Sequence, residues 1–297
     1  MVAPLGRMQR HRARFAAAGA LLCALLVVGV VPVGAAAQGH ASAGHGTSGG
    51  RLGVPTDSPF PPFFPGVFDD STVPTFPDGT AVGAIGRWVA AALGARADRL
   101  NQLGNEVTAA NNLSTAAQTT LQDLLAADAA GIATLQAEAS GGAGLSTLEG
   151  VASSMVLSYR VFAVVTPLVR DSIELSNQIQ RTTSLQSGEA ALEAAITTGF
   201  QSGSASASAQ GIYRDLVNQL APVVGTDQTQ LAAVLAMHPA SYTPSEATIS
   251  TAEAAISDGW NRVRTAVADE RRIVRLLAAP GLSSNHRILR LLRTLLK

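Results

Sequence analysis

Apolar residues recur every three or four positions along residues 84–281, which is the spacing that places them on one face of an α-helix. No segment alternates apolar and polar residues between turn residues, as a half-buried strand does. The pattern therefore predicts an all-α fold, an up-and-down helical bundle over residues 84–281.

The first two helices are predicted over residues 85–110 and from Ser114 or Thr115 to residue 139. Serine and threonine are favourable N-cap residues, so either position is a suitable start. The second helix has one apolar face, made of Leu121, Leu124, Leu125, Ile132 and Leu135. A run of Ser, Gly and Ala at residues 140–144 ends it.

A third helix is predicted over residues 146–183, with apolar residues on two faces, which is typical of a central position in a bundle. We expect Pro167 to kink this helix, because proline lacks a backbone N–H and its ring clashes with the preceding turn. Arg160 lies in the middle of the stretch, and a charge at the centre of a bilayer costs about 2.5–3.5 kcal/mol on insertion scales. We therefore interpret the stretch as a core helix and not as a membrane span.

The chain beyond residue 183 is predicted to form shorter elements and then one long helix. The shorter elements are a helix over 188–200, a Ser/Ala/Gly-rich loop over 202–209, and helices over 212–220 and 228–237. The long helix begins with a capping box, in which Thr243 is the N-cap, Pro244 the first helical residue and Glu246 the third. It is expected to run to about residue 279, before Pro280-Gly281.

The last helix, predicted over residues 285–296, separates its side chains completely into two faces. One arc holds Ile288, Leu289, Leu291, Leu292, Leu295 and Leu296, and the opposite arc holds Arg287, Arg290, Arg293 and Lys297. A basic amphipathic helix is typical of binding to an anionic membrane surface or to a protein groove. The alternative is that its leucines complete the core of the bundle.

Residues 1–37 have the three parts of a secretory signal peptide. Four arginines and no acid lie in residues 1–14, an apolar run covers 15–33, and Ala35-Ala36-Ala37 is a small-residue cleavage site. Cleavage after Ala37 predicts a secreted or cell-envelope protein. An uncleaved anchor is the alternative, because an apolar run of this length can just span a bilayer.

Residues 38–83 are predicted to form a non-helical arm. Gly, Ser and His dominate it through residue 53, and Pro and Phe dominate residues 59–68, where proline bars a helix. The aromatic rings either pack against the side of the helical body or bind a partner in polyproline conformation.

The charged residues are unevenly distributed although the formal net charge of the chain is zero. Residues 38–270 carry ten arginines and 21 acidic residues, a net charge of −11, whereas residues 271–297 carry a net charge of +7. Export and an acidic body argue against a nucleic-acid partner. The single cysteine, Cys23, lies in the signal peptide, so the exported chain has no thiol for a disulfide or a metal site.

Tyr159 and Arg160 are the strongest internal candidates for a site, because an arginine between two apolar faces needs a carboxylate or free carbonyl groups. The candidate partners are Asp98, Asp123, Asp128 and Glu149. The group is either a core ion pair that determines the register of the helices or a ligand site.

A metal site at the mature N-terminus is conditional on cleavage after Ala37. Gln38 would supply a free amine and His40 a third-position imidazole for Cu(II) or Ni(II), with His45 as a further ligand, unless the glutamine cyclises. No G-x-S-x-G, H-E-x-x-H or P-loop motif occurs in the chain. The sequence therefore predicts no enzyme and no cofactor.

Residues 96–180 resemble a family of secreted helical proteins of actinobacteria. The resemblance rests on Ala97-Asp98-Arg99-Leu100, on Leu113-Ser114 at a helix start, and above all on residues 159–167, a Tyr-Arg-Val-Phe run followed by valines and Pro167. The chain departs from the family at Arg170-Asp171-Ser172, which replaces a more apolar continuation. The family has no assigned activity, so the resemblance implies export and a helical hairpin fold.

These features predict a secreted, non-enzymatic helical protein with an interaction or structural role, exerted through the basic tail at residues 282–297. The alternative is a small-ligand or metal-binding carrier with a pocket in the bundle near Tyr159 and Arg160.

Overall fold

The computed structural model describes residues 66, 68, 70, 72–200 and 205–277. The chain divides into two units, Met1–Gly53 and Val54–Lys297, and the described residues belong to the second. Within them every regular element is a helix, so the predicted all-α fold is confirmed. The predicted signal peptide, the metal ligands Gln38, His40 and His45, and the basic tail lie outside the described residues.

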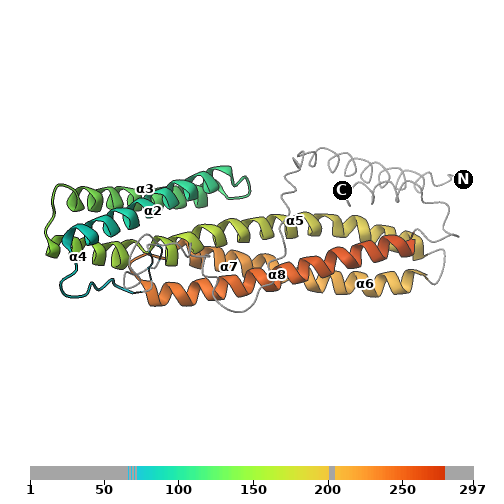
Figure 1. Cartoon of the computed structure of the whole chain (residues 1–297). Coiled ribbons are helices and arrows are strands. Elements are labelled where there is room, and N and C mark those ends of the chain that lie inside the picture. The colour runs from blue at the N-terminus through green and yellow to red at the C-terminus, as the bar shows by residue number, and fades with distance from the viewer. Residues whose placement is uncertain (1–65, 67, 69, 71, 201–204, 278–297) are drawn as a thin grey trace, which may run out of the picture. The chain divides into compact units, whose positions relative to one another are not determined.

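The first two helices form an antiparallel hairpin (Figure 1). Helix α2 spans Val82–Ala109 and α3 spans Thr115–Ala139, close to the predicted bounds. The side chain of Ser114 accepts a hydrogen bond from the Ala117 amide at 3.2 Å, so Ser114 is the predicted N-cap. Four residues of the predicted apolar face of α3 are buried, and Leu124 is partly buried; the four are Leu121, Leu125, Ile132 and Leu135.

The predicted third helix is interrupted at Arg160 and continues further than expected. Helix α4 spans Leu145–Ser154, two π-helical turns follow at Met155–Tyr159 and Val161–Val165, and α5 spans Thr166–Phe200. Pro167 is the second residue of α5 and follows directly after the second π-helical turn, whereas the interruption lies at Arg160, so the kink expected at Pro167 stays a prediction. The predicted end at residue 183 was wrong, since α5 continues to Phe200 and its residues Leu192 and Ile196 are buried in the smaller apolar cluster with α6 and α8.

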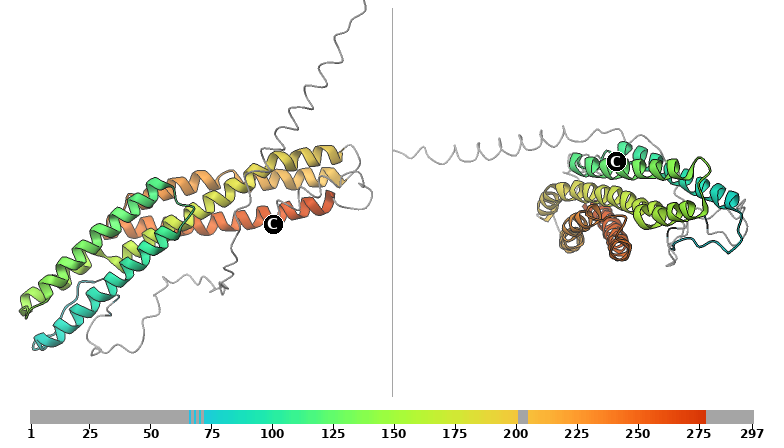
Figure 2. Two further views of the ribbon diagram at one scale, coloured as in Figure 1. Left: turned by 90° about the horizontal axis from the view of Figure 1, so that it is seen from above. Right: turned by 90° about the vertical axis from the view of Figure 1, so that its left-hand side faces the viewer.

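Helices α5 to α8 form a second, elongated bundle (Figures 1 and 2). Helices α6 (Ala205–Leu220) and α7 (Val223–Leu235) run back along α5, and α8 (Tyr242–Leu277) returns beside them. The predicted loop at 202–209 was wrong for residues 205–209, because Ala209 is fully buried in the core and packing outweighs the polar composition. The short helix at 228–237 starts five residues earlier than predicted.

Helix α8 begins without the predicted capping box. It starts at Tyr242, so Thr243 lies inside the helix instead of before it. The Ser245 amide and hydroxyl both donate to the Ser241 carbonyl, at 3.1 and 2.6 Å, and Ser245 is buried. The first turn of α8 is therefore closed on the Ser241 carbonyl, slightly upstream of the position that the local sequence favours.

The buried apolar residues form two clusters. The larger cluster joins the α2–α3 hairpin to α4, the first half of α5 and the adjoining ends of α7 and α8. The smaller cluster joins the second half of α5 to α6 and the second half of α8. Valines 161, 164 and 165 and Leu168 are fully buried, which confirms the predicted central position of this segment.

One helical stretch is long and apolar enough to cross a membrane by length and composition alone. It runs over Leu145–Thr198, and its most apolar window has a mean hydropathy of 1.5. More than half of that window, 56%, is buried against other parts of the protein, as the core helix of a bundle is.

Candidate functional site

Asp70 lies in a segment that leads into α2 and places a carboxylate at the interruption near Arg160. We call the described residues 66, 68, 70 and 72–81 the strap. The Asp70 side chain is fully buried and forms an ion pair with Arg96 of α2. Its Oδ2 atom accepts hydrogen bonds from the Phe162 amide at 2.6 Å and the Ala163 amide at 3.3 Å. Arg160 Nη1 donates to the main-chain carbonyl of Asp70 at 2.6 Å.

The backbone conformation at Arg160 makes these amides available. Arg160 has φ 35° and ψ 50°, the left-handed region, and is the one non-glycine residue with positive φ among the described residues. This conformation separates the two π-helical turns and leaves the Phe162 and Ala163 amides at the start of a new helical segment, without carbonyl partners in the preceding turn. Amides at a helix start bind carboxylates well.

Aromatic rings cover the ion pair on one side. The Arg96 guanidinium carbon lies 5.3 Å from the centroid of the Phe162 ring, within the range of a cation–π interaction. The Phe68 ring meets Phe162 edge to face at 5.1 Å. Phe76 of the strap similarly meets Trp88 at 5.5 Å. Phe68 is the one described ring of residues 59–68, and for it the predicted packing against the helical body is confirmed.

A second arginine of α2 supports the interruption. Arg99 Nε donates to the Thr166 hydroxyl at 3.2 Å, and this hydroxyl donates to the Val161 carbonyl at 2.8 Å. Arg99 also forms a salt bridge with Glu106 at 3.1 Å. The two buried arginines, one helical turn apart on α2, therefore both contact the segment after the break, Arg96 through Asp70 and Arg99 through Thr166.

Tyr159, the residue before the break, packs on α3. A Cβ atom added to Gly131 would overlap the Tyr159 ring, so glycine at this position makes room for the tyrosine. The tyrosine thus acts as a packing residue between the break and the hairpin.

Sequence reasoning identified Arg160 and missed Asp70. The four acids proposed as partners were Asp98, Asp123, Asp128 and Glu149, whereas the carboxylate at the break comes from the strap and pairs with Arg96. The available signal was an acidic pair, Asp69-Asp70, directly after an aromatic run. The spacing of apolar residues could not predict the position of Asp70, because the strap is non-helical and its apolar residues do not recur at a regular spacing.

Three other buried carboxylates have no such set of donors. Burial raises the pKa of Asp128 and of Asp227 to about 7. The pKa of Asp171 is also raised to about 7, by burial first and then by the nearby charges of Glu253 and Glu174. Each carboxylate has at least one buried oxygen without a hydrogen-bond partner among the described residues.

Two further polar residues are buried in the second bundle, Asp227 of α7 and Gln178 of α5. Gln186 of α5 donates to the Leu220 carbonyl at 3.4 Å. Gln178 donates to the Ile256 carbonyl at 3.0 Å and lies against Gly259 of α8. Gln178 and Asp227 are almost completely buried.

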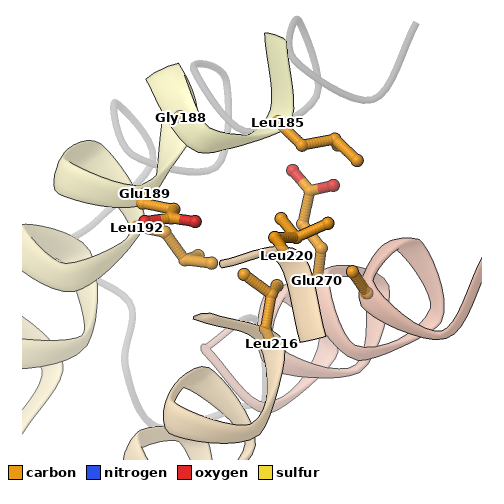
Figure 3. Close-up of a pocket in the computed structure, with 8 residues that line it drawn as sticks. Leu185, Gly188, Glu189, Leu192, Leu216, Leu220 and Glu270 are labelled. Atoms are coloured by element: carbon orange, nitrogen blue, oxygen red, sulfur yellow. The ribbon is translucent and has the colours of Figure 1, made fainter. Parts of the chain in front are cut away.

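A shallow groove lies further along the second bundle (Figure 3). Leucines line it together with Glu189 and Glu270, whose pKa values are both raised by burial. The groove has room for about one water molecule. Tyr159 and Arg160 do not line this groove, and it is too small for an organic ligand.

Among residues 72–200 and 205–277 and the described residues before them, no group of three His, Cys, Asp or Glu side chains could hold a metal ion. The chain as a whole matches no protein-family model, no curated protein and no solved structure. The resemblance over residues 96–180 therefore stays a prediction.

Proposed function

We propose that the protein is exported and acts without catalysis, as a helical interaction protein of the cell envelope whose basic tail, residues 282–297, binds an anionic membrane surface. The observation that carries the proposal is the complete separation of Arg287, Arg290, Arg293 and Lys297 from the leucine face that includes Leu291, Leu292 and Leu295. Such a segment combines electrostatic attraction with apolar insertion.

The charge distribution supports a contact made by the tail. Residues 38–270 carry a net charge of −11, so an anionic bilayer repels the body and attracts the tail. The same charges allow the tail to dock on the body, and the experiment must separate these two outcomes.

Co-sedimentation of the chain from residue 38 to 297 with vesicles of phosphatidylglycerol and phosphatidylcholine tests the proposal. The truncated variant should end at residue 281. Ile273 and Leu277 are buried in the smaller apolar cluster, so a deletion from residue 271 would damage the core as well as remove the tail. We expect the truncated variant to lose vesicle binding.

A charge variant keeps the leucines and tests the electrostatic part. Replacement of Arg287, Arg290 and Arg293 by glutamine should weaken binding about 100-fold, at about 1 kcal/mol per basic residue near an anionic surface. The matched control replaces three exposed arginines of the body, Arg181, Arg214 and Arg264, by glutamine. Equal binding by the two triple variants, or binding that does not change on truncation, would contradict the proposal.

Export is tested separately by sequencing the N-terminus of the protein recovered from the culture medium or envelope. Cleavage after Ala37 predicts Gln38, or its cyclised form, as the first residue. Recovery of the uncleaved chain in the membrane fraction would instead support an anchor.

A further inference from the structure

The donors around Asp70 all come from the helical bundle, whereas the carboxylate comes from the strap. We call Arg96, Arg160 and the main-chain amides of Phe162 and Ala163 the cradle. Arg96 contacts one carboxylate oxygen and the two amides contact the other, so both oxygens are bound. This is the arrangement by which proteins bind a carboxylate ligand, with an arginine and helix-start amides.

The cradle also recognises the chain that carries the carboxylate. Arg160 donates to the main-chain carbonyl of Asp70, and the Phe68 ring, two residues before, packs on Phe162. Phe162 in turn lies under the Arg96 guanidinium. The bundle therefore contacts three features of a short peptide: an aromatic side chain, a carboxylate two residues later and the main-chain carbonyl of that acidic residue.

The strap has the properties of a segment that can detach from the cradle and bind it again. Its described residues are non-helical, and Asp70 makes four polar contacts to the bundle, with Arg96, Arg160, Phe162 and Ala163. A turn at Pro77–Thr80, with Gly79 at φ 79°, joins the strap to α2. A segment without regular backbone hydrogen bonds opens at a lower free energy than the helices it contacts.

We propose that the cradle is a carboxylate-binding site and that Asp70 occupies it as an exchangeable ligand supplied by the strap of the same chain. When the strap leaves, a carboxylate from another source takes its place. That source is either a free small carboxylate or the Phe68-x-Asp70 segment of a second copy, which is strap exchange. This proposal is independent of the basic tail, so either proposal can fail without the other.

Chemical rescue of Asp70→Ala tests the site. The substitution removes the carboxylate and leaves space between the donors, which formate or acetate can fill. Ligand that binds the folded state stabilises it by mass action. We expect the melting temperature of Asp70→Ala to rise by about 2–4 °C in saturating formate, relative to sodium chloride at the same pH and ionic strength, and that of the wild type to stay constant.

The matched control is Asp227→Ala, which removes a buried carboxylate that has no donors around it among the described residues. Formate should not raise its melting temperature. If Asp70→Ala is unfolded in chloride, recovery of helical circular dichroism in formate supports the site equally. The same response in formate and in chloride, or an equal rise for Asp227→Ala, overturns the proposal.

Mixing two variants identifies the source of the carboxylate. Asp70→Ala has a cradle without a ligand, and Arg96→Gln has a ligand without a complete cradle. A 1:1 complex of the two in light scattering after size exclusion, absent for each variant alone, supports strap exchange between copies. Rescue by formate without such a complex supports the site and assigns it to free carboxylates.

Discussion

Asp70 and Asp227 are both almost completely buried, but their carboxyl groups differ in the hydrogen-bond donors around them. Asp70 lies against an arginine and two main-chain amides and has a donor for each oxygen. Asp227 lies on α7, which packs against α5 and α8, and neither of its oxygens has a hydrogen-bond partner among the described residues. Burial raises the pKa of Asp227 to about 7, so its carboxyl group stays protonated well above the usual pH for an aspartate.

The comparison shows that burial alone does not decide what an acidic residue does in a core. A carboxylate with a full set of donors joins segments, as Asp70 joins the strap to α2 and to the break at Arg160. A carboxylate without donors weakens the folded state once it ionises. Replacing Asp70 should therefore lower the stability of the folded state. Replacing Asp227 by a neutral residue should raise it at high pH.

The largest effect is expected for Asp70→Asn. The amide keeps the shape but brings an NH2 group toward the amides or the arginine, and Arg96 loses its ion-pair partner in a buried site. Breaking such a pair costs about 3–5 kcal/mol of the free energy of unfolding. Urea unfolding followed by circular dichroism measures this cost.

Asp78→Asn is the control for that substitution, because Asp78 lies in the same strap and is exposed. Its effect should stay within about 0.5 kcal/mol. A similar loss for both variants would mean that strap charge, and not the cradle, stabilises the fold.

The next largest loss of stability is expected for two glycines that make room for side chains. Gly131 lies near the break at Arg160, and Gly259 lies in the second bundle. Gly131 receives the Tyr159 ring and Gly259 receives the Gln178 amide, so alanine at either position forces a shift. We expect each substitution to cost about 1–3 kcal/mol in urea unfolding.

Gly104→Ala in α2 is the matched control for both glycines. Nothing lies within 4 Å of the added Cβ atom there, so the helix propensity of alanine should stabilise the protein by about 0.5–1 kcal/mol. Stabilisation by alanine at Gly131 would show that the tyrosine moves without cost.

Asp227→Asn tests how the ionisation of this buried carboxyl group affects stability, because asparagine has nearly the same size and does not titrate. The pKa of Asp227 is raised from 3.8 to about 7 in the folded protein, so the unfolded chain releases this proton first as the pH rises. Stability contributed by the protonated group is therefore present below about pH 4 and is lost between about pH 4 and 7. At pH 8 the asparagine variant should be more stable than the wild type by about 1–3 kcal/mol.

At pH 4 the same substitution should change the free energy of unfolding by less than about 0.5 kcal/mol, because a neutral carboxyl group and an amide are similar in size and polarity. Thermal melts of both proteins at the two pH values test this. A constant difference between them across pH would mean that the residue does not titrate in this range.

The smallest effect is expected for Asp258→Asn. Asp258 accepts a hydrogen bond from Arg262 one turn later on α8, at 2.7 Å, and both side chains are exposed. Exposed pairs at this spacing contribute about 0.3–0.5 kcal/mol. A loss above about 1 kcal/mol at moderate salt would contradict this assignment.

The helical faces could be read directly from the order of residues. Leu121, Leu125, Ile132 and Leu135 are buried as their spacing predicted, and Ser114 caps α3. Local rules failed at residues 205–209, where Ala209 is fully buried, and at Thr243, which lies inside α8. A local pattern reports preferences of a few tenths to about 1 kcal/mol, and burial in a core outweighs them.

The candidate site could be predicted only in part. An arginine between apolar faces signalled that Arg160 needs a partner, and this was correct. The left-handed conformation of Arg160 could not be predicted, and neither could its hydrogen bond to the carbonyl of Asp70, ninety residues earlier in the chain. Helical spacing relates residues within one helix and says nothing about which non-helical segment contacts a helix break.

Periodicity and charge are properties of neighbouring residues, so the order of residues alone was enough to predict the all-α class, the buried faces of the helices and the separation of an acidic body from a basic tail. Which buried acids have donors could be learned only from the folded chain. The donors come from segments that are distant in the sequence, as Arg96 does for Asp70, and among the described residues no such donor reaches Asp227.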